Sequence, residues 1–329
     1  MTTINDVAKL AGVSKSTVSH VFNRTKPTSK EIQEKVFKAA EKLNYKRNYF
    51  AKTLATNKSK VIGIRLDSEH EFFDAFQHQV VEGILQACVS RDYYLLVMPK
   101  RQRRNESFPV DGMIMMNPST TDNYLLKLPH VWLGKPLDSL SSPYYVDSNN
   151  EQIIEEIIDV LIKNQHKSIL FLNSSRNKTV SHTRYQTFIS ELVSNGYSIE
   201  EAKARHYFAE GEKHPVSFAA KAFYIGYDKF KPDAVIVDND YMAQGIYRAS
   251  ETMGLSIPHK LSVISISGTL NSFDMFSPRL SSVKLNELEL GRATANLLMD
   301  LIEGKTIVSR TQFVEGKIDL KESVRRVDD

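Results

Sequence analysis

The sequence predicts an α/β protein in which a small all-α head precedes a larger core of parallel sheets flanked by helices. Residues 1–60 read as short capped helices and hold 13 Lys/Arg and 4 Asp/Glu, a balance of +9. The remaining 269 residues hold 30 Lys/Arg and 35 Asp/Glu, a balance of −5. From Val61 onward, short apolar runs alternate with amphipathic segments, a pattern typical of parallel strands joined by helices.

The bulk composition favours a soluble protein of a reducing compartment. Cys88 is the single cysteine, so no intrachain disulfide can form, and its apolar helical surroundings predict burial. The first ten residues show no basic segment followed by an apolar run, and no stretch reaches about 18 consecutive apolar residues. We therefore expect a cytoplasmic chain of two or three domains that does not contact a membrane.

Three short helices are predicted in the head. Gly12 ends the first of them, where a tight turn needs a positive φ. Capping signals open the helices at Thr3 with Asp6, at Ser14, and at Thr28 with Glu31. The inward faces combine Ile4, Val7, Ala8, Ala11, Val18, Val21, Phe22, Ile32, Val36, Ala39, Ala40 and Leu43. Small residues at the crossing allow the close approach that a helix-turn-helix needs.

The outward face of the second helix is polar and cationic, which favours nucleic acid as the partner. The N-terminal residues of a recognition helix reach base edges in the major groove, and Lys or His can donate to guanine O6 and N7. The base-reading residues are therefore predicted to be Lys15, Ser16 and His20. Phosphate contacts are predicted for Thr17, Ser19, Asn23 and Tyr45. The other interpretation is a face that is only solvated.

The head resembles the DNA-binding domain of the lactose/galactose repressor (LacI/GalR) family of bacterial transcription regulators. The matching motifs are Ile4-x-Asp-Val-Ala-x-x-Ala-Gly-Val-Ser14, Thr17-Val-Ser-x-Val-x-Asn23, Ala40-x-x-Leu-x-Tyr45 and Asn48-x-x-Ala-x-x-Leu54. Many positions match at fixed spacing over about 60 residues, so the resemblance is specific.

The resemblance implies a hinge at residues 48–60 that becomes helical when a dimer sits on its operator. Leu54 would then wedge into a base step of the minor groove, with Asn48 and Ala51 beside it. Such a wedge costs a few kcal/mol, which the contacts made by bent DNA recover. The family usually has proline before the asparagine, whereas this chain has Arg47, which lacks the fixed φ of proline. The alternative is a plain linker.

The core pattern predicts strands at 61–66, 94–98, 112–116, 131–133, 168–173, 234–237 and 261–266, and helices at 74–91, 150–164, 183–195, 214–228, 240–253 and 286–303. Asn286 with Glu289 is expected to cap the last helix, and Gly304 to end it. The layout resembles the family's two-lobed core, which is like that of periplasmic binding proteins and has three strand crossings.

The expected domains are a head at 1–47, a hinge at 48–60, an N-terminal lobe at 61–146 and 283–305, and a C-terminal lobe at 147–282 and 306–329. Catalysis is not indicated, because no two histidines lie at i, i+4 and the G-x-S-x-G, Walker and G-x-G-x-x-G motifs are absent. We expect no enzyme activity, no metal site and no cofactor.

An effector site is expected at the carboxyl ends of the strands. The resemblance implies Asp147, Arg184, Asn239, the adjacent Asp240, and Ser267. Arg184 and Asp147 could hold polar or anionic groups, while Asp147 and Asp240 could instead cap the helices that follow them. The family commonly has Gly-Phe-Asp-Asp where this chain reads Ser265-Ile-Ser-Gly268, so Ser267 replaces an aspartate that grips sugar hydroxyls.

A second departure is the short stretch between Met98 and Val110, where the family has a whole helix and this chain has a basic loop, Lys100–Arg104. That loop is either solvated or an extra phosphate or partner contact. The resulting expectation is a homodimeric repressor of carbohydrate-utilisation genes. Its partners would be double-stranded DNA with a palindromic operator and a sugar or sugar phosphate effector. One alternative is control by a phosphorylated metabolite or a partner protein, and a remote one is a solute-binding protein.

Overall fold

A computed structural model of the chain describes residues 2–23, 26–46, 58–66, 75–98, 109–118, 128–136, 143–210, 214–267 and 275–327. The chain divides into a compact unit, Met1–Ser59, and a larger unit, Lys60–Asp329. None of the helices in these ranges is long and apolar enough to cross a membrane.

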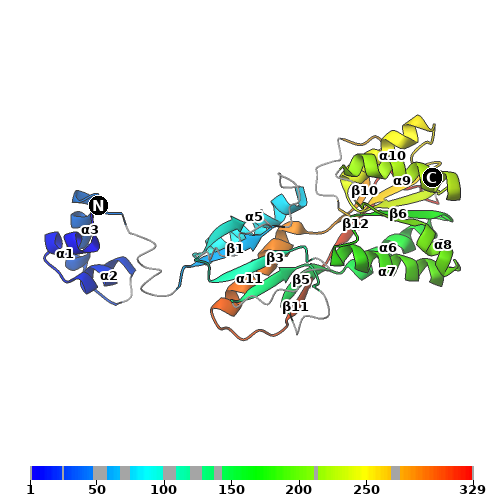
Figure 1. The fold of residues 1–329 in the computed structure, drawn as a ribbon. Coiled ribbons are helices and arrows are strands. Elements are labelled where there is room, and N and C mark those ends of the chain that lie inside the picture. Colours follow the sequence, from blue (N-terminus) through cyan, green and yellow to red (C-terminus); the bar gives the residue numbers. More distant parts are fainter. Residues whose placement is uncertain are drawn as a thin grey trace. The chain divides into compact units, whose positions relative to one another are not determined.

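The described residues of the smaller unit form three helices, α1 (Ile4–Ala11), α2 (Lys15–Asn23) and α3 (Lys30–Lys42), as predicted (Figure 1). The backbone N–H and hydroxyl of Thr3 both donate to Asp6 Oδ2 at 2.8 Å, so this carboxylate satisfies the first turn of α1. Gly12 ends the helix at φ 67°. The Ser14 hydroxyl accepts from the Thr17 N–H at 3.0 Å, which confirms Ser14 as the cap of α2.

The predicted cap of α3 is wrong by one residue. The helix begins at Lys30, and the hydroxyl of Ser29 accepts from the Ile32 N–H at 3.4 Å. Thr28 precedes this cap and accepts from the side chain of Gln33. Glu31 is therefore a first-turn residue whose carboxylate pairs with Lys35 at 2.8 Å instead of closing a capping box.

The predicted inward faces of the head do form one apolar cluster. Val7, Val18 and Val36 are fully buried at its centre, one from each helix. Around them pack Ile4, Ala8, Ala11, Val21, Phe22, Ile32, Ala39, Ala40, Leu43 and Tyr45. With so few residues inside, the head depends on each of them and on its helix caps.

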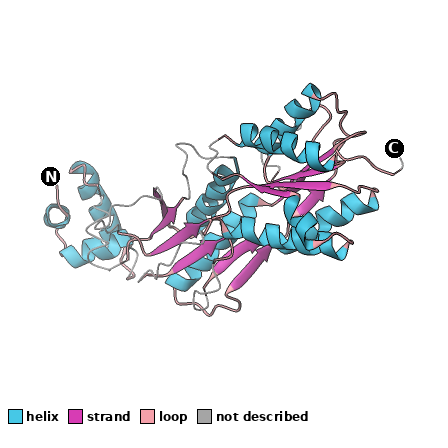
Figure 2. Ribbon diagram, turned by 45° about the vertical axis from the view of Figure 1, so that its right-hand side comes forward, coloured by secondary structure: helices cyan, strands magenta, loops and turns pink. Residues whose placement is uncertain are grey.

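The first sheet of the core is wholly parallel (Figure 2). In spatial order its strands are β11 (Thr311–Val314), β5 (Tyr145–Ser148), β4 (His130–Leu133), β3 (Gly112–Met116), β1 (Val61–Arg65) and β2 (Tyr94–Met98). Helices α5 (Ala75–Ser90) and α11 (Glu287–Ile302) pack closely together. A Cβ on Gly83 or Gly291 would come within 2.0 Å of a carbonyl oxygen on the facing helix, so glycine permits this approach.

The second sheet is parallel except for one edge strand. In order its strands are β12 (Lys317–Asp319), β10 (Ser281–Lys284), β9 (Ser262–Ser265), β8 (Ala234–Val237), β6 (Ile169–Asn173) and β7 (His206–Phe208), with β12 antiparallel to β10. Among the described residues of this lobe the helices are α6 (Asn150–Lys163), α7 (Thr179–Ser194), α8 (Ile199–Ala204), α9 (Pro215–Phe230) and α10 (Asp240–Thr252). Alternate residues of β6 and β8 enter two different apolar clusters, so this sheet is covered on both faces.

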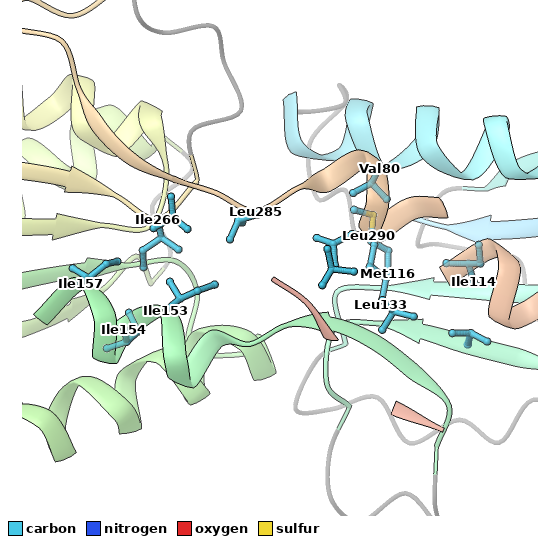
Figure 3. Close-up of a cluster of buried hydrophobic side chains, with 14 of the residues drawn as sticks. Val80, Ile114, Met116, Leu133, Ile153, Ile154, Ile157, Ile266, Leu285 and Leu290 are labelled. Atoms are coloured by element: carbon cyan, nitrogen blue, oxygen red, sulfur yellow. The ribbon is translucent and has the colours of Figure 1, made fainter. Parts of the chain in front are cut away.

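One apolar cluster continues from the first lobe into the second (Figure 3). Leu285 lies on the connection between β10 and α11, and Figure 3 shows it between Ile266 on one side and Leu290 on the other. Ile153 on α6 belongs to the same cluster. Burial of these side chains therefore stabilises the junction of the lobes as well as each lobe.

The lobe limits differ from the prediction at the crossings. Residues 311–314 fall within the expected C-terminal lobe, yet β11 pairs with β5 in the first sheet. Asp147 and Ser148 also belong to that sheet, while Val283 and Lys284 belong to the second. The edge strands β11 and β12 are short and partly exposed, so they carry little apolar signal.

The predicted cap of the last helix is also wrong. Asn286 takes a left-handed backbone conformation at φ 58° with no side-chain cap hydrogen bond, and Glu289 pairs with Arg292. Asn286 therefore serves as a turn residue, a role that asparagine tolerates well. Gly304 does follow the helix end at φ 69°, as predicted.

Candidate functional site

The N-terminus of α2 gathers polar groups on the surface of the head. Lys15 and Ser16 are exposed, at the first two helical positions. The Ser14 hydroxyl lies 2.7 Å from that of Ser16 and 2.8 Å from that of Thr17. A helix N-terminus carries partial positive charge, and Lys15 adds a full one. This end of α2 can therefore offer donors to base acceptors or phosphate oxygens, and the base-reading role of Lys15 and Ser16 stays a prediction.

The other predicted head residues differ in exposure. Ser19 and His20 are half-buried on α2. The ring of Tyr45 packs 5.9 Å from that of Phe22, so Tyr45 contributes to the packing of the head, and its phosphate contact stays a prediction. The side chain of Asn23 lies outside the described residues, as do Asn48, Ala51, Leu54 and the basic loop Lys100–Arg104.

Asp147 is a buried carboxylate at the end of β5. One of its oxygens accepts from the backbone N–H of Lys135 at 3.0 Å, and the other accepts from the side-chain amide of Asn150 at 3.1 Å. Burial raises the pKa of Asp147 to about 6, because desolvation outweighs these hydrogen bonds and the charge of Arg184. Asp147 therefore titrates near neutral pH.

Arg184 on α7 joins Asp147 to the second sheet. Its Nε donates to Asn150 Oδ1 at 2.8 Å, and its Nη1 donates to Asp238 Oδ1 at 2.5 Å. Asp238 directly follows β8, and its other oxygen accepts from the hydroxyl of Ser174. Asp147, Asn150, Arg184, Asp238 and Ser174 thus form one chain of hydrogen bonds, here called the cleft network.

Sequence reasoning found two members of the cleft network and missed the other three. Asn150 was hidden inside the predicted helix, and Ser174 follows β6 without any charge to mark it. Asp238 did carry a signal, because it is the first residue after a fully buried strand. In parallel sheets such positions share one edge, where ligands bind.

The helix-capping alternatives are settled by neighbouring asparagines. Asn149, not Asp147, caps α6 by accepting from the Gln152 N–H at 3.3 Å. Asn239, not Asp240, caps α10 by accepting from the Met242 N–H at 3.1 Å. The predicted effector contact of Asn239 would therefore have to form while the same side chain caps α10.

The two remaining predicted effector residues lie close to the same edge. Asp240 is buried in the first turn of α10. Ser267 is half-buried after β9, and its carbonyl accepts from the Ser265 hydroxyl at 3.0 Å.

An aromatic group lies behind the cleft network. The ring of His206 is 4.3 Å from Phe208, 4.6 Å from Tyr185 and 5.0 Å from Phe171. Burial lowers the pKa of His206 to about 3, although the nearby Asp238 opposes this shift. His206 is therefore neutral at pH 7 and adds no charge to the site.

The start of α7 connects the network to the first lobe. The Thr179 hydroxyl donates to the carbonyls of Lys135 at 2.6 Å and Pro118 at 3.3 Å, and both follow strands of the first sheet. Lys135 also holds Asp147 through its N–H. The carboxyl ends of the two sheets therefore meet at the cleft network.

Two surface pockets in the described chain lie away from this network. One, of about 610 Å³, lies between α6 and residues 315–320, and the other, of about 400 Å³, lies among α6, α7 and α8. The cleft network is defined by its buried polar groups and not by a pocket volume, because buried polar groups are nearly always hydrogen-bonded to specific partners.

Comparison with known proteins agrees with this arrangement. Residues 3–48 match the bacterial regulatory proteins of the lacI family, and residues 158–324 match the periplasmic binding protein-like domain. The chain belongs to the lacI family. It is therefore a DNA-binding transcription regulator with a helix-turn-helix head, and not an enzyme.

Relatives along the whole chain are similar regulators. The probable HTH-type transcriptional repressor ExuR of Bacillus subtilis is 29% identical over 348 residues, covering 99% of both chains. The HTH-type transcriptional repressor PurR of Haemophilus influenzae is 30% identical over 322 residues, covering 93% of this chain and 92% of that protein.

Solved structures show the same fold for this lacI-family chain. The lac repressor dimer bound to operator and the anti-inducer ONPF has a TM-score of 0.81 at 22% identity and covers 98% of each chain. The transcriptional regulator CelR–cellobiose complex has a TM-score of 0.70 at 21% identity, covering 98% of this chain and all of that one. At these identities the likeness concerns fold alone.

Proposed function

We propose that the chain is a homodimeric repressor of carbohydrate-utilisation genes, released from or held on its operator by a small molecule bound at the cleft network. The observation that carries this proposal is the combination of two sites in one chain. A helix-turn-helix presents Lys15 and Ser16 at the start of α2, and a buried polar network lies where two sheets meet. The relatives named above are repressors, which supports repression of the controlled genes rather than their activation.

The control is thermodynamic. A molecule that contacts Asp147 and Arg184 binds residues held by different sheets, so its affinity depends on how the lobes are arranged. A ligand that prefers one arrangement shifts the population of the DNA-binding form, and DNA shifts ligand affinity by the same factor. Thr179, which donates to carbonyls of the first lobe, belongs to the joint that would respond.

The proposal includes a palindromic operator. One helix-turn-helix reads only a half-site, and a two-fold dimer reads two half-sites about one helical turn, or a multiple of it, apart. Within each half-site, Lys15, Ser16 and His20 would read bases. Leu54, beside Asn48 and Ala51, would enter the minor groove at the centre.

Selection of binding sites from a random DNA library with the purified full chain tests this proposal. The expected result is enrichment of one two-fold symmetric sequence. Its position in the source genome would then identify the controlled genes and, from their products, the metabolite. An enriched site without symmetry would contradict the dimer, and no enrichment would contradict sequence-specific binding.

A further inference from the structure

Asp238, the acidic residue that follows β8, pairs with Arg184 and limits which ligand groups Arg184 can bind. Asp238 Oδ1 lies 2.5 Å from Arg184 Nη1, and the two side chains are only 10% and 8% exposed. Ser174 donates to the remaining oxygen of Asp238, which fixes the carboxylate in place. Arg184 is therefore already neutralised by a group of the protein itself.

Apart from the Arg184–Asp238 pair, the buried charged side chains near the cleft network are acidic. Asp147 and Asp240 are both buried, whereas Arg184 is the single Lys or Arg among the buried residues of the described chain. Arg176, whose charge also acts on His206, pairs with Glu210 at 2.6 Å at an exposed position. Lys135 contributes its backbone N–H to Asp147.

We propose that Asp238 sets the charge class of the effector, so that the cleft accepts a neutral, hydroxyl-rich molecule and rejects phosphates and carboxylates. This inference rests on the proposed function, which places the effector at the cleft network. An anionic group at Arg184 would compete with Asp238 for the guanidinium and would place a second negative charge beside a buried carboxylate, which is strongly unfavourable. Hydroxyl groups can instead donate to Asp238 and Asp147 while the ion pair stays intact.

The geometry of the second sheet supports this role. Strand β8 lies beside β9, with Val237 opposite Ser265, so Asp238 and Ser267 end neighbouring strands. Asp238 thus presents carboxylate acceptors at the edge of the sheet where the neighbouring strand presents the hydroxyl of Ser267. Acceptors of both kinds suit the hydroxyl groups of a neutral ligand.

Binding of inorganic phosphate to the purified full chain, measured by calorimetry, tests the inference without knowledge of the effector. The wild-type chain is expected to show no phosphate binding that depends on Arg184. Asp238→Asn keeps the shape of the side chain but removes its charge, so phosphate affinity should rise on the order of tenfold. The double variant Asp238→Asn with Arg184→Gln should lose that gain.

Glu210→Gln is the matched control, because it also removes the carboxylate partner of an arginine, but at a solvated position. It should change phosphate affinity less than about twofold, since exposed pairs contribute little. Circular dichroism establishes that each variant is folded, and Asp238→Ser is the second variant if the asparagine is not tolerated. Arg184-dependent phosphate binding by the wild-type chain, or no gain in a folded Asp238 variant, would overturn the inference.

A panel of hexoses, each with its uronate and 6-phosphate, extends the test to effectors. Any member that stabilises the wild-type chain against heat should be neutral, and Asp238→Asn should admit the acidic counterpart. Tighter wild-type binding of the acidic member, abolished by Arg184→Gln, would refute the charge assignment. Neither assay contains DNA, so a failure here is distinguishable from a failure to bind an operator.

Discussion

The head and the cleft network differ in how their charged and polar side chains are placed. In the head, Lys15 and Ser16 are exposed and follow one another in sequence on a single helix. In the cleft network, Arg184 and Asp238 are buried, 54 residues apart, and hold each other. Exposed polar groups are available to a large external partner, whereas buried ones are first satisfied internally. The head is therefore suited to binding DNA, and the cleft network to discriminating between small molecules.

The largest effect is expected when a substitution destabilises the core and the stability of the head is measured in the same variant. Phe188 on α7 is fully buried, with its ring 5.3 Å from that of Phe171. Phe188→Ala should lower the free energy of unfolding of the core by about 3–5 kcal/mol, through lost burial and the cavity left behind. Urea denaturation of the core measures this loss.

Ile225→Ala, at an exposed position on α9, is the control and should cost less than about 0.5 kcal/mol. Amide exchange in residues 2–23 should stay as in the wild type, because the head forms its own unit. Loss of protection in the head of the folded Phe188 variant would show that the two units are not independent.

Acid should weaken the core through His206. Its pKa is about 3 in the folded chain and about 6.5 when unfolded, so the unfolded state binds more protons between these values and stability falls as pH falls. Between about pH 7 and about pH 4 the loss is about 3 kcal/mol. His206→Phe, which suits the aromatic surroundings, should remove that part of the pH dependence of urea unfolding. An unchanged dependence would contradict a buried neutral histidine.

Asp147 should titrate with the opposite sign. Its folded pKa of about 6 exceeds the ordinary value of 3.8, so its contribution is complete at low pH and is lost as pH rises through 6. Relative to Asp147→Asn, the wild-type chain should lose about 2 kcal/mol of stability between about pH 4.5 and about pH 7. The measurement is the difference between the two unfolding curves against pH. A difference that grows with pH instead would mean that Asp147 is stabilised as a carboxylate.

The smallest effect concerns the head alone. Lys15→Ala should weaken binding to the selected site by about 1–2 kcal/mol and relax preference at one base pair of each half-site. Lys35→Ala is the matched control, because Lys35 is an exposed lysine of α3 that pairs with Glu31. It should change affinity less than about threefold. Equal effects of the two variants would mean that Lys15 contributes only general charge.

The contrast between the units also explains what the sequence could predict. In the head, caps and apolar spacing act over three or four residues, so α1, α2 and most of the buried cluster were predictable. The cap of α3 was missed because Thr28 and Ser29 offer the same signal in adjacent positions. Local patterns sufficed wherever the partners were local.

The cleft network depends on partners that local patterns do not connect. Family resemblance predicts Arg184 and Asp147, but Asn150 and Asp238 join them only when four elements converge, namely β5, α6, α7 and the end of β8. The edge strand β11 was unpredicted for a related reason, since its pairing with β5 spans more than 160 residues of sequence. Long-range pairing is set by the whole fold.

The central claim is that a cationic helix-turn-helix reads DNA sequence, and the salt dependence of binding tests it most directly. Fluorescence anisotropy measures the affinity of the chain for the selected site and for a scrambled duplex, from about 50 to about 200 mM salt. The two titrations give the salt dependence of binding and the preference for the selected sequence. We expect affinity for both duplexes to fall steeply, on the order of 10³-fold for the selected site, because phosphate contacts release counterions. The selected site should remain at least about 10³-fold tighter than the scrambled one. A flat salt response, or equal affinity for the two duplexes, would contradict the claim.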